Sequence, residues 1–162
     1  DSNSTIVGLL FAAVSVGALI GALSSGWVSR VKRQGLAVVW SIVIWGIGIV
    51  GFGVSGSALG LALFFLALAG AADVISAVFR NTILQVNVPD DLRGRMSGVH
   101  ILVVAGGPRI GDVEAGLVAA LTSPTISVIT GGLACIVGVL VLAVKVPGLV
   151  RYRSDDPKSI DA

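Results

Sequence analysis

Apolar residues along the chain fall into five long stretches separated by short polar turns. A helix needs about 20 mostly apolar residues to cross roughly 30 Å of hydrocarbon, and each stretch meets that length. The pattern therefore predicts an all-α fold, a polytopic transmembrane helix bundle of five spans within residues 1–150, followed by a tail at 151–162. The expected spans cover residues 5–25, 36–54, 58–79, 97–121 and 125–144.

The composition fits a lipid bilayer as the main solvent. Hydrophobic residues make up 55% of the chain and charged residues 12%, whereas ordinary globular domains carry roughly 25% charged residues. The basic residues are not interleaved with aromatic ones, so we expect no nucleic-acid partner. The single cysteine, Cys135, allows no internal disulfide and no cysteine cluster, so we expect neither a metal nor a cofactor.

The basic residues predict how the spans are oriented. Of the 11 Lys and Arg residues, all but Arg109 fall on one side of a five-span zigzag, and the positive-inside rule makes that side cytoplasmic. We therefore expect a multi-pass protein of the cell (inner) membrane, with the N-terminus of the chain outside and the tail cytoplasmic. An odd number of spans with an outside start favours a chain that is part of something longer, and the alternative is a complete five-span protein.

Small residues predict close helix packing. Lipid tails give helices no hydrophobic drive to associate, so close backbone approach supplies much of the packing energy. Glycine and alanine recur at three- and four-residue spacing in the spans at 5–25, 36–54 and 97–121. These contacts are either static or sliding surfaces in a moving transporter.

The fourth span contains a predicted helix break. Pro108 removes a backbone donor, and Gly106 and Gly107 just before it loosen the helix. We expect a kink or local unwinding at this point. Irregular backbone inside a membrane is tolerated where it lines a cavity, so this segment is a candidate cavity wall.

Charged residues inside the fourth span are candidates for function. A charge near the bilayer midplane costs about 3 kcal/mol on insertion-based scales, so it is seldom kept without a partner or a cavity. Arg109 and Asp112 are three residues apart and can share a face, whereas Glu114 lies about 140° round from Arg109. These residues line a translocation pathway or carry coupling protons, or else they form buried pairs that hold the bundle together.

A second polar stripe lies on the third span. Asp73, Ser76 and Arg80 fall on one helix face, because seven residues return nearly to the same angular position. Asp73 joins the candidates for the pathway or for proton coupling, with a structural ion pair as the alternative. Arg80 is expected to reach the inner interface, and His100 is expected to be solvated rather than to relay protons.

The first basic loop, residues 26–35, resembles a loop motif of the major facilitator superfamily. Gly26 matches the leading glycine, and Arg30, Lys32 and Arg33 match the basic cluster. The acidic residue four positions after the glycine is replaced by Arg30. The resemblance implies a cytoplasmic loop or gate that lacks the motif's acidic partner.

The second basic loop, residues 80–97, resembles the linker between the tenth and eleventh helices of the enterobactin (siderophore) exporter branch of that superfamily. Pro89 is expected to end the preceding helix, and Asp90 or the next aspartate is expected to cap the following one. Arg93 and Arg95 are expected to hold this end at the anionic inner surface.

Residues 106–112 also resemble that branch, and the likeness covers nearly the whole chain as helices eight to twelve of a twelve-helix fold. It implies a transporter rather than an enzyme. The expected activity is export of a small molecule, with a siderophore such as enterobactin as a candidate, driven by proton antiport. The implied partners are the bilayer, the missing N-terminal helices of the same transporter and the small-molecule substrate.

Two other classes of function compete with this interpretation. Residues 53–56 spell G-x-S-G and His100 follows later, as in an intramembrane serine protease. Ser55 and His100 are expected at opposite membrane depths, too far apart for hydrogen bonding, which argues against it. A non-transporting structural or assembly protein would need no polar residues at mid-membrane.

Overall fold

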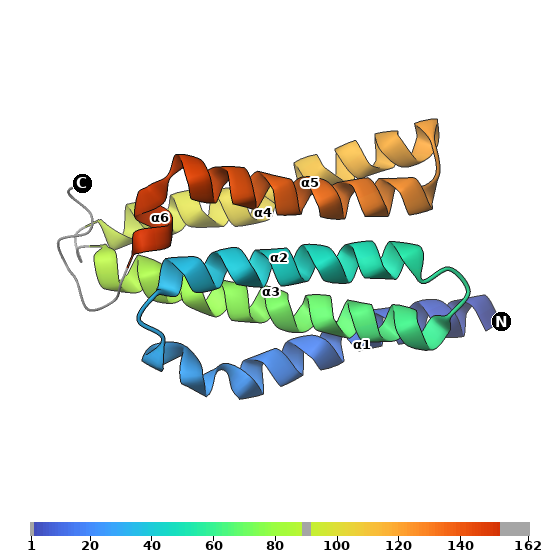
Figure 1. The fold of residues 1–162 in the computed structure, drawn as a ribbon, viewed down its shortest axis with the longest axis horizontal. Helices are drawn as coiled ribbons and strands as arrows, with labels where there is room; N and C mark the ends of the chain where they lie inside the picture. Colours follow the sequence, from blue (N-terminus) through green and yellow to red (C-terminus); the bar gives the residue numbers. More distant parts are fainter. Residues whose placement is uncertain (1, 89–91, 153–162) are drawn as a thin grey trace.

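In a computed structural model, residues 2–88 and 92–152 are described, and within these ranges the regular structure is entirely helical (Figure 1). The predicted all-α, polytopic helix bundle is confirmed. Five long helices make up the bundle, with one 3-10 helix and one short C-terminal helix between or after them. The elements are α1 (Ser2–Ser24), η1 (Ser25–Arg30), α2 (Gln34–Val54), α3 (Leu59–Asn87), α4 (Arg93–Leu121), α5 (Pro124–Lys145) and α6 (Pro147–Arg151).

Four stretches of the described residues are long and apolar enough to span a membrane, namely Ser4–Val28, Gln34–Val54, Leu59–Val86 and Pro124–Lys145. Helix α4 is not among them, although its 29 residues exceed the roughly 20 that a crossing needs. Its charged residues and its glycines lower its hydropathy. The crossing by α4 therefore stays a prediction, which its length and its course alongside α5 support (Figure 1).

Helix α3 extends further than its apolar stretch predicted. It continues to Asn87, whereas the sequence predicted a loop from residue 80 onward. Arg80 therefore lies inside the helix. No helix-breaking residue occurs in this polar stretch. Val88, the residue before Pro89, takes an extended backbone with φ −95° and ψ 120°, as a residue before proline prefers.

The helices pack in a defined order. α3 packs against both α1 and α2, α2 also packs against α5, and α5 packs against α4. A Cβ atom on Gly17 of α1 would clash with the backbone of Ala67 of α3. Between α2 and α5, a Cβ on Gly46 would lie 3.0 Å from the carbonyl oxygen of Gly132. The small residues of α1 and α2 therefore serve close helix packing, as predicted.

Polar groups fix the ends of several helices. The Ser123 side chain accepts a hydrogen bond of 3.2 Å from the backbone N–H of Ile126, and Pro124 occupies the first turn of α5. Gly56, in the turn between α2 and α3, has a φ of +53°, which favours glycine. Helices α2 and α3 therefore run antiparallel through a tight turn, as do α4 and α5 (Figure 1).

Candidate translocation site between the helices

Asp73 and Arg80 lie along one cavity, together with Ser76 between them on the same face of α3. The Arg80 Nη2 and Asp73 Oδ1 atoms are 3.9 Å apart, a long ion pair between two side chains that are 41% and 65% exposed. These three residues thus share one face of α3, as their spacing along the sequence predicted. The cavity measures about 230 Å³ and is lined by Ile42, Trp45, Asp73, Ser76, Arg80 and Cys135.

A second cavity of about 490 Å³ lies between α2, α4 and α5. Asp112 and Glu114 both line it, whereas Arg109 does not. Residues two apart on a helix differ by about 200° in angular position about the helix axis. The two carboxylates therefore lie on opposite sides of the stripe of α4 that lines the cavity. The cavity therefore pairs Asp112 with Glu114, whereas the sequence had grouped Asp112 with Arg109.

The two cavities adjoin each other. Trp45 of α2 and Cys135 of α5 line both of them. Acidic side chains from two helices, Asp73 of α3 and Asp112 of α4, consequently lie along neighbouring spaces that share these two walls. Sequence reasoning did not select Trp45, because nothing in its own span marks it as polar or charged.

The predicted helix break in α4 takes a different form. The helix runs without interruption from Arg93 to Leu121 with Pro108 inside it, so the expected unwinding is wrong. Proline removes one backbone hydrogen bond, and the remaining bonds keep the helix continuous on both sides of it. The alternative, a kink at Pro108, stays a prediction. Pro108 does line the larger cavity, and Cβ atoms on Gly106 or Gly107 would meet nothing within 4 Å.

Two helices are joined by a side chain. The Ser127 hydroxyl of α5 donates a hydrogen bond of 2.8 Å to the carbonyl oxygen of Ala115 in α4. Ser127 is buried and lines the larger cavity. This bond positions α4, and with it Asp112 and Glu114, against α5.

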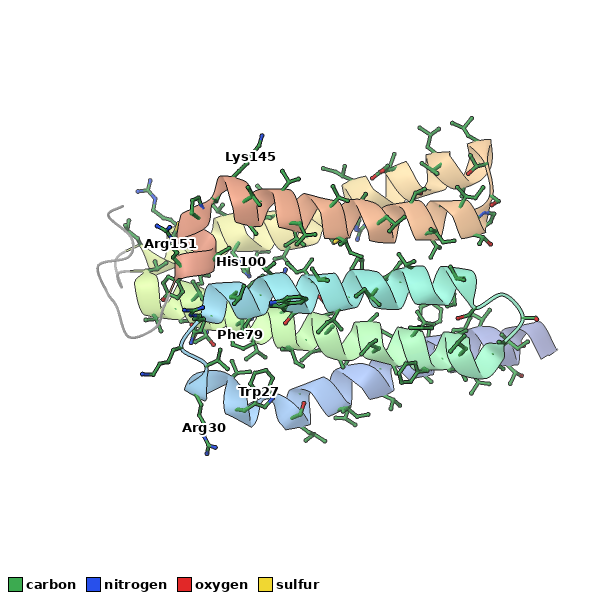
Figure 2. The ribbon with its side chains drawn as sticks, in the orientation of Figure 1. Trp27, Arg30, Phe79, His100, Lys145 and Arg151 are labelled. Carbon is green, nitrogen blue, oxygen red and sulfur yellow. The ribbon has the colours of Figure 1, made fainter. Side chains whose placement is uncertain are left out.

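The basic residues of the loops gather at one end of the bundle. Arg30, Lys145 and Arg151 lie toward the end that is opposite the N-terminus of the chain (Figure 2). Lys32 and Arg33 lie in the short link between η1 and α2, and both are exposed, as are Gly26 and Arg95. Arg93 is the first residue of α4, and Asp90 lies outside the described residues.

The protease arrangement is not formed. Ser55 caps the end of α2, and its hydroxyl donates a hydrogen bond of 2.6 Å to the Gly51 carbonyl oxygen. His100 lies in the half of α4 near the basic end of the bundle, far from the turn that follows α2 (Figure 2). Within the described ranges, no three His, Cys, Asp or Glu side chains converge as metal ligands would.

Apolar helices that pack through small residues, with charged side chains along the cavities between them, define a multi-pass membrane protein. A family model described as "Transmembrane secretion effector" matches residues 1–159. The chain therefore belongs to this family of the major facilitator superfamily.

Several curated relatives are proteins named enterobactin exporter EntS. The chain is 31% identical over 153 residues to the one from Salmonella typhimurium, 32% over 151 residues to that from Citrobacter koseri and 33% over 153 residues to that from Escherichia coli O81. These matches cover 93% to 94% of the chain but only 36% to 37% of each relative, so the chain spans little more than a third of their length. No solved structure matches the chain.

Proposed function

We propose that this chain works in a major facilitator exporter that moves a small molecule, of the siderophore class, out of the cytoplasm by proton antiport. The observation that carries the proposal is the identity of 31% to 33% with enterobactin exporters, which extends over nearly the whole chain. Export, substrate class and coupling belong to a whole transporter, of which these residues supply one part.

The charged residues of α3 and α4 support a transport role. A carboxylate in the hydrocarbon region is costly unless water, a partner or a cavity surrounds it. Asp73, Asp112 and Glu114 each line a cavity, where they can bind and release protons. Arg109 lies outside both cavities, and the proposal gives it the role of a positive charge for an anionic group of the exported molecule.

Further helices of the same transporter are the proposed partners of α4. Among the described residues α4 packs chiefly against α5, and most of its side chains are exposed. The curated relatives are nearly three times as long as the matched region, which leaves ample chain for such helices. The exposed surface of α4 outside the larger cavity is therefore available to such helices, because the described helices leave it uncovered.

The basic end of the bundle suggests the orientation. We place it on the cytoplasmic side of the inner membrane, because Lys and Arg accumulate in cytoplasmic loops. The N-terminus of the chain then lies outside and its C-terminus lies in the cytoplasm. The loop residues Gly26, Arg30, Lys32, Arg33, Asp90, Arg93 and Arg95 are the proposed cytoplasmic gate.

Efflux measurements on the full transporter test this proposal. Asp112→Asn and Arg109→Gln remove one charge each with little change of shape, and we expect each to lower enterobactin efflux about tenfold or more, the effect of losing roughly 1.4 kcal/mol. Lys145→Gln, which changes an exposed charge outside both cavities, is the matched control and should leave efflux unchanged. Normal efflux by both variants at normal membrane levels would favour a structural or assembly role instead.

A further inference from the structure

Ser76, which lines the smaller cavity, carries a buried hydroxyl that no other described residue bonds to. Ser76 is 2% exposed, and its Oγ atom meets no donor or acceptor among the residues that the structure describes. Other hydroxyls in these helices bond to their own backbone, as Ser41 does to the Ala37 carbonyl oxygen at 2.8 Å. Leaving a buried hydroxyl unpaired costs about 1–3 kcal/mol. The Ser76 hydroxyl therefore indicates that a ligand in this cavity supplies the missing partner.

The walls of the cavity define what such a ligand can be. Trp45 and Ile42 of α2 offer apolar surfaces on one side. On the α3 side, the charges of Asp73 and Arg80 offset each other at 3.9 Å, so the cavity favours a neutral ligand over an ion. A polar edge and an apolar wall together suit a molecule with a hydroxyl group on an apolar frame.

The size of the cavity narrows the choice further. Its volume is about 230 Å³. A protein cavity of roughly 150 Å³ holds one benzene molecule, so this one has room for a single ring with substituents. Water alone would satisfy the hydroxyl, but it would leave the indole of Trp45 and the side chain of Ile42 facing water.

We propose that this cavity is a binding subsite for a neutral, hydroxyl-bearing ring. The ring lies against Trp45, and its hydroxyl group bonds to Ser76 Oγ and to the Asp73 carboxylate, which Arg80 holds in place. As a contact point for the exported molecule, the subsite rests on the proposed export function. As a binding site, it can be tested without transport.

Fluorine NMR of the full-length protein carrying 5-fluorotryptophan supplies a local readout. The Trp45 signal is assigned by its loss in Trp45→Phe, and it is then followed during titration with phenol and with toluene. The two probes have nearly the same shape, but toluene has a methyl group where phenol has a hydroxyl. The ratio of their affinities, compared between variants in the same detergent, removes the effect of their different partition into micelles.

We expect phenol to shift the Trp45 signal saturably. In Ser76→Ala the ratio of phenol to toluene affinity should fall about five- to tenfold, the effect of one lost hydrogen bond. Ser41→Ala is the matched control, because Ser41 is also buried on a helix but lies outside this cavity, and it should leave the ratio unchanged. Asp73→Asn should lower the ratio as well, which serves if Ser76→Ala does not fold.

Two results would overturn the subsite. The first is a Trp45 signal that phenol does not shift saturably, which would leave water as the occupant. The second is the same affinity ratio in the parent, in Ser76→Ala and in Asp73→Asn. Binding with normal ratios but without any efflux would instead count against the export proposal alone, so the two failures can be told apart.

Discussion

Phe79 is the most completely buried large side chain among the described residues. It is 0% exposed and packs with Val28 and Val38, and its ring centroid lies 5.8 Å from that of Trp27 (Figure 2). Edge-to-face aromatic pairs of this kind add to the energy of apolar burial. Phe79 therefore packs η1, which follows α1, against α3.

Phe79→Ala should lower the free energy of unfolding by about 3–5 kcal/mol, because it opens a cavity in a packed site. Unfolding of the purified full-length protein in mixed micelles, followed by circular dichroism against SDS fraction, measures the change. Phe64→Ala makes the same substitution at a position that is 60% exposed, and its effect should stay below about 1 kcal/mol. Equal losses in the two variants would show that Phe79 has no special packing role.

The stripe of Asp73, Ser76 and Arg80 could be predicted from sequence, because helical spacing alone places these residues on one face. The opposite walls of their cavity could not. Trp45 and Cys135 come from α2 and α5, and periodicity tells which residues share a helix face but not which helix lies opposite. For the same reason Glu114, assigned to another face than Arg109, could not be placed beside the Asp112 cavity in advance.

At the level of elements, the contact between α1 and α3 depends on glycine. Cβ atoms at Gly17 and Gly70 would each clash with the backbone of the facing helix, and one at Gly21 would lie 2.7 Å from the Ala71 carbonyl oxygen. Backbone atoms cannot turn aside as a flexible side chain can. The two helices must therefore move apart to admit even one methyl group.

Gly17→Ala should destabilise the protein by about 1–3 kcal/mol, the usual cost of overpacking a tight site. The loss should outweigh the gain of up to about 1 kcal/mol that alanine brings to a helix interior. The thermal midpoint of the full-length protein, read by fluorescence-detected size-exclusion chromatography, should fall. Gly8→Ala, in the same helix but with nothing within 4 Å of the added Cβ, should hold or raise the midpoint. A rise in both variants would contradict close α1–α3 packing.

The five long helices could be predicted because each crossing requires a long apolar stretch. The end of α3 could not, since hydropathy marks where the hydrocarbon ends and not where the helix ends. Arg80 and the polar residues after it continue the helix until Val88, where the following proline imposes extended backbone. The short helix α6 was also missed. It begins at Pro147, directly after α5 and Val146, and its five residues are too few to show a helical period.

On the scale of the whole molecule, α2 connects the pair α1 and α3 to the pair α4 and α5. It packs against α3 on one side and α5 on the other, while α1 joins through α3 and α4 joins through α5 (Figure 1). The larger cavity lies between α2, α4 and α5, and the smaller one lies between α2, α3 and α5. Helix α2 therefore lines both cavities, and Trp45 contributes to each of them.

The orientation of the bundle gives the final prediction. In a Cys135→Ser background, single cysteines replace Lys32, Arg151 and Ser57, the last in the turn between α2 and α3. A membrane-impermeant maleimide applied to intact spheroplasts should label the cysteine at position 57, because α2 carries the chain across the bilayer from the basic end. The cysteines at positions 32 and 151 should react only in inverted vesicles, since both lie at that basic end. Labelling of positions 32 and 151 from opposite sides would contradict the predicted crossings, α4 included, because an even number of crossings separates the two sites.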